Sequence, residues 1–238
     1  MAEQTVDHWS VTISTVRRFL LILLAALPIS AAEVRVSAAA SLTDAVTEIA
    51  RLYEGKTGET VVLNFGASSI LATQIVNGAP ADVFVSADEA QMNRVATVVR
   101  VPLLSNRLVV IGVPLLKARR IAIANPEAVP AGVYAKQWLQ QRGLWTVLAP
   151  KIVPTENVRG ALAAVEAGNA DAAIVYATDA RMARRARVAE VVNVGPPIVY
   201  PAALLRDAEN AAAGRRFLDF LRSRDAGAIF RRYGFLVK

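Results

Sequence analysis

Cysteine is absent from the 238-residue sequence, and histidine occurs once, as His8. Without cysteine the chain has neither disulfide bonds nor a thiolate nucleophile, so its stability must come from packing alone. His8 lies in an N-terminal segment that we expect to be removed. The remaining chain would then have no histidine general base and no metal site of the usual His and Cys type. These absences exclude enzymes that depend on either residue.

Long hydrophobic runs are also missing, because the apolar run at residues 19–27 is too short to cross a membrane. A pair of arginines precedes this run, and the small residues Ser30 and Ala32 follow it, as in a secretory signal. We therefore predict that residues 1–32 are a signal peptide, with residues 1–15 as an extra N-terminal extension. No cysteine follows the cleavage site, so no lipid anchor is expected, and the mature protein is predicted to be periplasmic.

Segments typical of strands and helices alternate along the rest of the chain, in which apolar residues are frequent enough for a sizeable core. This alternation predicts an α/β fold with mostly parallel sheets. The expected strands lie at residues 33–40, 61–65, 82–86, 106–113, 121–124, 152–155, 172–176, 188–194 and 198–205. The expected helices lie at residues 42–53, 70–76, 88–99, 132–142, 158–167, 208–221 and 226–233, with a further helix capped by Thr178 and Asp179.

The order of these elements predicts two lobes. Residues 33–109 and 198–238 would form lobe I, and residues 110–197 would form lobe II. The chain would then cross twice between the lobes, and these two crossings would act as a hinge.

Two serines stand where a predicted strand passes into a predicted helix. Ser41 is followed three residues later by Asp44, which is the pattern of a capping box, and Ser68 precedes the next helix in the same way. Parallel strands end at the same edge of a sheet, so both hydroxyls are expected at one edge, beside the free N–H groups of helix N-termini. Such a place favours an anion, although either serine alone could be a plain N-cap.

Five phrases of the sequence, taken together, resemble one family, the periplasmic molybdate-binding proteins of ABC transporters. They are AAASLTDA at 38–45, GASSILATQIVNGAPADVFVSAD at 66–88, NPEAVPAGVYAKQWL at 125–139, ENVRGALAAVEAGNADAAIVYATDA at 156–180 and IFRRYGF at 229–235. The resemblance covers nearly the whole mature chain. It implies a type II periplasmic binding-protein fold, with helices on both faces of the sheets and a tetrahedral oxyanion held in the cleft between two lobes.

The resemblance also implies the ligand contacts. Ser41 and Ser68 would bind the oxyanion by hydroxyl and backbone N–H, Ala131 and Val158 by backbone N–H, and Tyr176 by its hydroxyl. The ligand would be molybdate or tungstate, and molybdenum would enter only as this oxyanion, with no catalytic residue and no cofactor. The expected partner is the permease of an ABC importer, and the protein is expected to be a monomer that binds no nucleic acid. One departure from the family pattern is a shorter segment between Asp88 and Asn125.

Other functions share parts of this pattern. Another tetrahedral oxyanion, such as sulfate, would suit the same donors. A serine hydrolase would need a G-x-S-x-G turn and a base, but Ile70 stands in the place of the second glycine. Porphobilinogen-polymerising enzymes share the lobe architecture but need a cysteine for their cofactor. A ligand-sensing module of a regulator would bring a DNA-binding head and no export signal.

The charge of +7 raises the possibility of nucleic-acid binding, for which the run RMARRAR at residues 181–187 is the best candidate. An export signal and the lack of an aromatic-rich basic face oppose this reading. We interpret the run as the solvated face of a helix, with docking to an acidic surface of the transporter as a lesser possibility.

Overall fold

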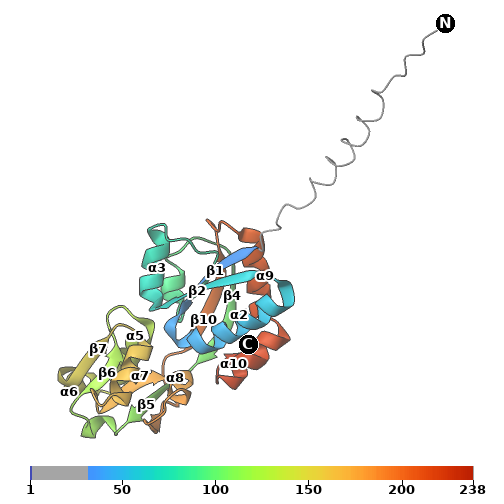
Figure 1. Cartoon of the computed structure of the whole chain (residues 1–238). Helices are drawn as coiled ribbons and strands as arrows, with labels where there is room; N and C mark the ends of the chain where they lie inside the picture. The colour runs from blue at the N-terminus through green and yellow to red at the C-terminus, as the bar shows by residue number, and fades with distance from the viewer. Residues whose placement is uncertain (2–31, 238) are drawn as a thin grey trace. The chain divides into compact units, whose positions relative to one another are not determined.

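The computed structural model describes Met1 and residues 32–237, so nearly all of the predicted signal peptide lies outside the described residues. The described residues fold around two β-sheets (Figure 1). The strands are β1 (Glu33–Ala39), β2 (Thr60–Gly66), β3 (Val83–Val85), β4 (Thr97–Asn106), β5 (Leu108–Gly112), β6 (Ile121–Ala124), β7 (Ile152–Thr155), β8 (Ala172–Tyr176), β9 (Val188–Val191), β10 (Ile198–Leu205) and β11 (Leu236–Val237).

The helices pack on these sheets and connect their strands. They are η1 (Ala40–Leu42), α2 (Thr43–Thr57), α3 (Ser68–Val76), α4 (Glu89–Met92), η2 (Leu115–Lys117), α5 (Pro130–Gln141), α6 (Trp145–Leu148), η3 (Ala149–Lys151), α7 (Val158–Glu166), α8 (Ala177–Arg181), α9 (Ala211–Leu221) and α10 (Arg224–Arg232), where η marks a 3-10 helix.

The first sheet has the strand order β11-β4-β10-β3-β1-β2 and, with its helices, forms the first lobe. Strand β1 pairs in parallel with β2 and β3, whereas β10 pairs antiparallel with β3 and β4. Val83 and Val85 of β3 share a buried cluster with Phe217 of α9, and Phe84 between them shares another with Leu71 of α3. Since alternate side chains of a strand point to opposite faces, helices cover both faces of this sheet.

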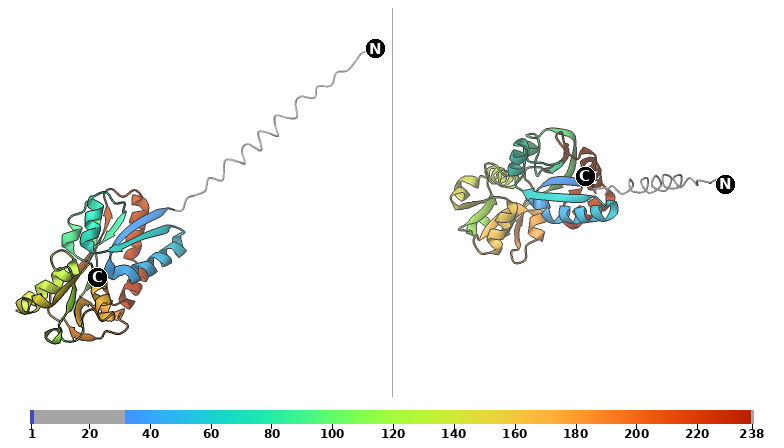
Figure 2. Two further views of the ribbon diagram at one scale, coloured as in Figure 1. Left: turned by 60° about the vertical axis from the view of Figure 1, so that its left-hand side comes forward. Right: turned by 45° about the horizontal axis from the view of Figure 1, so that its top comes forward.

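The second sheet has the strand order β7-β6-β8-β5-β9 and, with its helices, forms the second lobe. Strand β6 pairs in parallel with β7 and β8, whereas β5 pairs antiparallel with β8 and β9. Figure 2 shows the two lobes from two further directions. The predicted α/β fold with two lobes is confirmed, but both sheets are mixed, because β10 and β5 run against the parallel strands beside them.

The chain crosses from the first sheet to the second at Arg107, between β4 and β5, and returns between β9 and β10. The predicted boundary after residue 109 falls inside β5, so the first crossing comes earlier than expected. The side-chain oxygen Oδ1 of Asn106 accepts a hydrogen bond from the N–H of Arg107 at 2.9 Å, which fixes the backbone at this crossing.

The segment before this crossing differs from the prediction. The expected helix at residues 88–99 is wrong, because α4 covers only Glu89–Met92, capped by the Asp88 side chain. The expected strand at residues 106–113 is present as β5, whereas β4, which begins at Thr97, was not predicted. Several β-branched residues with alternating exposure near the start of β4 explain this result, since such residues favour strands. Between β5 and β6 only the short η2 is present, in agreement with the shortened segment of the sequence.

The basic run at residues 181–187 does not form the expected helix face. Helix α8 ends at Arg181, and the following backbone turns around the carboxylate of Glu166. This carboxylate accepts hydrogen bonds from the N–H groups of Arg184, Arg185 and Ala186. The basic run therefore forms a turn that is anchored to the end of α7.

Candidate ligand-binding site

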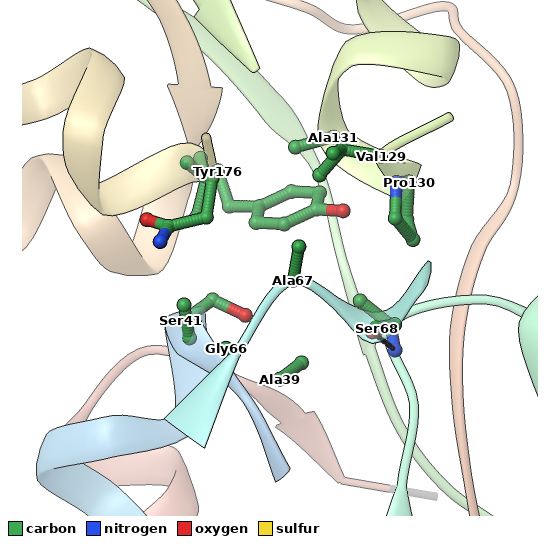
Figure 3. A pocket seen from close by; sticks show the side chains of 13 residues that line it. Ala39, Ser41, Gly66, Ala67, Ser68, Val129, Pro130, Ala131 and Tyr176 are labelled. Carbon is green, nitrogen blue, oxygen red and sulfur yellow. Dashed lines mark hydrogen bonds between the residues drawn. The ribbon is translucent and has the colours of Figure 1, made fainter. Parts of the chain in front are cut away.

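A cavity lies between the two lobes, at the ends of strands from both sheets (Figure 3). The space inside it is about 10 Å³, roughly what one water molecule needs. All five residues predicted to contact a ligand line this cavity, so the structure brings the predicted set together. The lining residues are Ala39, Ala40, Ser41, Gly66, Ala67, Ser68 and Ala87 from the first lobe, and Val129, Pro130, Ala131, Asn157, Val158 and Tyr176 from the second.

Ser41 reaches the cavity from the 3-10 turn η1, which directly follows β1. The predicted capping box is wrong, because α2 begins only at Thr43 and its N-cap, Leu42, has no side-chain hydrogen bond. The extra turn places Ser41 two residues before the helix, where its Oγ lies 3.0 Å from the phenol oxygen of Tyr200. The Ser41 hydroxyl is therefore held by another side chain and not by the backbone of α2.

Ser68 is the first residue of α3 and not its N-cap, which is Ala67. Its Oγ accepts a hydrogen bond from the N–H of Ala87 at 3.0 Å. The predicted cap is thus wrong here too, because the chain enters the helix one residue earlier than the capping pattern suggests. With an oxygen lone pair occupied by Ala87, the hydroxyl proton of Ser68 is free to be donated, and no side chain caps the first N–H groups of α3.

Helix α5 contributes a backbone donor from the second lobe. Its N-cap Val129 makes no side-chain hydrogen bond, and Pro130 at its first position has no N–H. The amide of Ala131 is therefore the first N–H of this helix. A Cβ on the next residue, Gly132, would lie 2.0 Å from the carbonyl oxygen of Ala124, so only glycine lets α5 start this close to the end of β6.

Helix α7 contributes a second backbone donor through a partial cap. The Oδ1 atom of Asn157 accepts hydrogen bonds from the N–H groups of Arg159 and Gly160, at 3.0 and 3.1 Å. These are the second and third residues of the helix, so the N–H of Val158, the first residue, is left without this acceptor. Sequence alone indicates a helix start here, and the structure shows which amide remains available.

Tyr176 ends β8, and Figure 3 shows its ring lying along the cavity with its hydroxyl directed into it. Its side chain is 1% exposed, and its hydroxyl has no hydrogen-bond partner among the described residues. Burial raises the pKa of Tyr176 well above its usual value, so the phenol stays protonated and acts as a hydrogen-bond donor. An unpaired buried donor of this kind points to a ligand that accepts from it.

The cavity is electrically neutral in its side chains, since none of its lining residues in the described part of the chain carries a charge. Its positive potential comes from the N-terminal ends of α3, α5 and α7, where N–H dipoles are aligned. The lining therefore offers mainly hydrogen-bond donors, namely the N–H groups at these helix starts and the hydroxyls of serine and tyrosine. It offers few acceptors. Such a set suits an oxyanion that carries no proton.

Ion pairs stand directly beside the cavity, and sequence reasoning missed them. Arg159 contacts Asp44 of the first lobe and Asp179 of α8, and the Asp179 side chain is fully buried. Asp179 was expected to cap α8, but this helix begins at Ala177, so Asp179 lies in its first turn.

Two α/β lobes around a donor-lined cavity define the protein as a solute-binding protein of the periplasmic type. Residues 34–236 match the family of bacterial extracellular solute-binding proteins, and the chain belongs to this family. It is 39% identical over 231 residues to the molybdate-binding protein ModA of Escherichia coli K12, an alignment that covers 87% of this chain and 90% of that protein. It is 35% identical over 234 residues to ModA of Haemophilus influenzae, with coverages of 88% and 92%.

Solved structures agree with this family. The periplasmic molybdate-binding protein of Azotobacter vinelandii superposes with a TM-score of 0.78 at 25% identity, covering 86% of this chain and 99% of that one. The sulfate-binding protein SubI of Mycobacterium tuberculosis superposes with a TM-score of 0.70 at 16% identity, covering 86% of both chains, and shares the fold alone. Within the described residues, no helix is both long and apolar enough to span a membrane, and no cluster of three His, Cys or acidic residues could hold a metal ion.

Proposed function

We propose that this protein captures molybdate, and tungstate in the same way, and delivers it to the permease of an ABC importer. One observation carries the proposal: the buried hydroxyl of Tyr176 has no partner among the described residues and faces a cavity of uncharged groups. An unpaired buried donor costs about 1–3 kcal/mol, which a ligand oxygen would recover. The ModA relatives, which carry the name of molybdate-binding proteins, support the choice of ligand.

The proposed contacts divide between the lobes. Ser41 and Ser68 of the first lobe would donate from hydroxyl and backbone N–H, and Ala131 and Val158 of the second lobe from backbone N–H. The Tyr176 hydroxyl would complete the set. No cation is needed for a dianion here, because each of the helix N-termini at α3, α5 and α7 supplies roughly half a positive charge.

This donor set would select against a protonated oxyanion. Hydrogen phosphate carries an O–H that would face another donor, which leaves both groups unpaired at a cost of about 1–3 kcal/mol or more. Sulfate has no proton, but its shorter bonds would leave its oxygens further from donors that are fixed on two lobes. Sulfate is the second candidate, because it is an unprotonated dianion and the uncharged lining of the cavity could donate to it as well.

A thermal-shift panel tests the proposal, using the mature protein with molybdate, tungstate, sulfate and phosphate at equal concentrations. At a ligand concentration near 1,000 times Kd, binding adds about 4 kcal/mol, which corresponds to roughly 8–16 °C in Tm for a protein of this size. We expect such a shift with molybdate and with tungstate, and almost none with sulfate or phosphate. A larger shift with sulfate or phosphate than with molybdate would overturn the ligand assignment and leave the fold untouched.

The proposed role in transport also implies where the protein works and how its lobes move. The protein would be exported, cleaved after Ala32 and work as a periplasmic monomer without enzymatic activity. The two lobes would act as the two closing bodies, and the boundary expected after residue 109 would lie at the crossing at Arg107. N-terminal sequencing of the secreted protein tests the processing, because a mature fraction that retains Met1 would contradict it.

A further inference from the structure

Behind Ser41 lies a chain of buried hydrogen bonds that does not itself line the cavity. The phenol oxygen of Tyr200 lies 3.0 Å from Ser41 Oγ, and Asn106 Nδ2 donates to the same phenol oxygen at 3.4 Å. Asn106 Nδ2 also donates to Thr178 Oγ1 at 2.9 Å. Tyr200 is on β10 and Asn106 ends β4, the two strands of the first sheet next to the crossings, whereas Thr178 is on α8 of the second lobe. All four side chains are buried.

The direction of these hydrogen bonds follows from the Asn106 amide. Its oxygen accepts from the N–H of Arg107, so its NH₂ group must face Tyr200 and Thr178. An NH₂ group can only donate, and Tyr200 therefore accepts from Asn106. The phenol proton of Tyr200 then has Ser41 Oγ as its acceptor. Burial raises the pKa of Tyr200 far above its usual value, so this proton stays in place.

The consequence for Ser41 concerns its own proton. Because Ser41 Oγ accepts from Tyr200, the Ser41 hydroxyl does not donate to Tyr200, and its proton can be directed toward the cavity. We propose that Tyr200, held by Asn106, is a positioning residue that makes the Ser41 hydroxyl a fixed donor to the ligand. This inference rests on the proposed function, and it assigns the selection against protonated oxyanions to a specific pair of residues. Without Tyr200, the Ser41 hydroxyl could rotate and accept from a ligand O–H.

The alternative is that Tyr200 only packs. Its ring makes edge contacts with Tyr176 and Phe235, at centroid distances of 5.9 and 5.6 Å. Both contacts remain in Tyr200→Phe, which removes the hydroxyl alone. This substitution therefore separates positioning from packing.

The test is a double-mutant cycle of Tyr200→Phe and Ser41→Ala, with molybdate affinity measured by calorimetric titration. We expect Tyr200→Phe alone to weaken binding about 3-fold to 10-fold. In the Ser41→Ala background, the same substitution should change the affinity by less than about 2-fold, since the group that it positions is gone. Tyr53→Phe is the matched control, because it also removes the hydroxyl of a buried tyrosine, one that is bonded to Glu59 away from the cavity.

The selectivity between molybdate and phosphate is a second readout, and a loss of packing alone would not change it. If Tyr200 fixes the Ser41 proton, Tyr200→Phe should lower the ratio of molybdate affinity to phosphate affinity, whereas Tyr53→Phe should leave it unchanged. If Tyr200→Phe folds poorly, Asn106→Ala takes its place in the double-mutant cycle. Its binding defect should likewise be absent when Ser41→Ala is also present. If the effects of Tyr200→Phe and Ser41→Ala on molybdate affinity add, or if Tyr200→Phe binds as tightly as the wild type, the positioning role of Tyr200 is wrong. The proposed function would not be affected by either result. Failure of the wild-type protein to bind molybdate would instead contradict the proposed function.

Discussion

Arg159 and Asp44 form an ion pair between the two lobes, with Nη2 of the arginine 2.5 Å from a carboxylate oxygen of the aspartate. Arg159 is the second residue of α7 and directly follows Val158, whose N–H lies at the cavity. Nε of the same guanidinium lies 2.7 Å from the buried carboxylate of Asp179. One guanidinium thus joins an anion of the first lobe to an anion of its own lobe, next to the proposed ligand donors.

The first prediction is that the ion pair of Arg159 and Asp44 stabilises the arrangement in which the two lobes are closed on the ligand. Asp44→Asn removes the anion of the first lobe while Arg159 keeps Asp179. Both side chains of the pair are partly exposed, so the loss should be modest, about 2-fold to 5-fold in molybdate affinity, chiefly as faster dissociation. Stopped-flow dissociation measures it.

The control for Asp44→Asn is Asp225→Asn. Asp225 pairs with Lys56 within the first lobe, so its loss should not affect closure. Equal changes in dissociation rate for the two variants would mean that the Arg159 pair does not contribute to holding the ligand.

The second prediction concerns the pH dependence of stability. Burial raises the pKa of Asp179 to about 6, outweighing the attraction of Arg159, whereas in the unfolded chain its pKa is about 3.9. Between these values the folded protein binds a proton that the unfolded chain has lost, so this group lowers the stability as pH rises from about 4 to about 6. The loss is complete above pH 6 and amounts to about 3 kcal/mol at most.

Asp179→Asn tests this effect, because asparagine does not titrate. We expect the two proteins to have similar Tm values near pH 4, and the Tm of the variant to exceed that of the wild type increasingly up to about pH 6.5. A difference in Tm that stays constant across this range would show that Asp179 does not titrate there.

The residues that line the cavity could be predicted in part, because the signals at helix starts are local. Ser41 and Ser68 stand where a strand passes into a helix, which the order of residues reveals, whereas Ala131, Val158 and Tyr176 came from the resemblance to the family. The predicted capping roles of the two serines were wrong, since a shift of one residue at a helix start moves a hydroxyl from a cap to another partner.

Contacts between distant parts of the chain could not be predicted. Arg159 lies 115 residues from Asp44, and Ser41 lies 159 residues from Tyr200. Nothing in the local pattern of either residue specifies such a partner, because the pairing depends on how the lobes are packed. The strand β4 was missed for a related reason, since its pairing with β10 decides its conformation over the weak helical pattern at its start.

The third prediction concerns the close approach of α5 to β6. In Gly132→Ala the added Cβ would lie 2.0 Å from the Ala124 carbonyl oxygen, so the start of α5 must move, and the Ala131 N–H with it. We expect a loss of about 1–3 kcal/mol in unfolding free energy, together with weaker molybdate binding. Gly55→Ala is the control, because nothing lies within 4 Å of its Cβ and alanine is the better helix former. It should be neutral or stabilising and bind normally, and a similar loss in both variants would contradict the steric argument.

The last prediction separates binding from stability at two hydroxyls of the same cavity. Tyr176→Phe removes a hydroxyl that has no partner among the described residues, so the free protein should be as stable as the wild type or more stable. Ser68→Ala removes the acceptor of the Ala87 N–H and leaves that donor buried and unpaired, so the free protein should lose about 1–3 kcal/mol of stability. Both variants should bind molybdate more weakly, by roughly 10-fold to 150-fold, because each loses a hydrogen bond to a charged ligand.

Thermal melting without ligand and calorimetric titration with molybdate measure the two quantities independently. The expected pattern is a lower Tm in Ser68→Ala, an unchanged or higher Tm in Tyr176→Phe, and weak binding in both. Undiminished affinity in Tyr176→Phe would mean that its hydroxyl does not meet the ligand, and the proposal would lose the observation that carries it. A lower Tm in Tyr176→Phe would instead indicate that the hydroxyl stabilises the free protein, for example through a buried water, since removing an unpaired donor cannot destabilise the fold in this way.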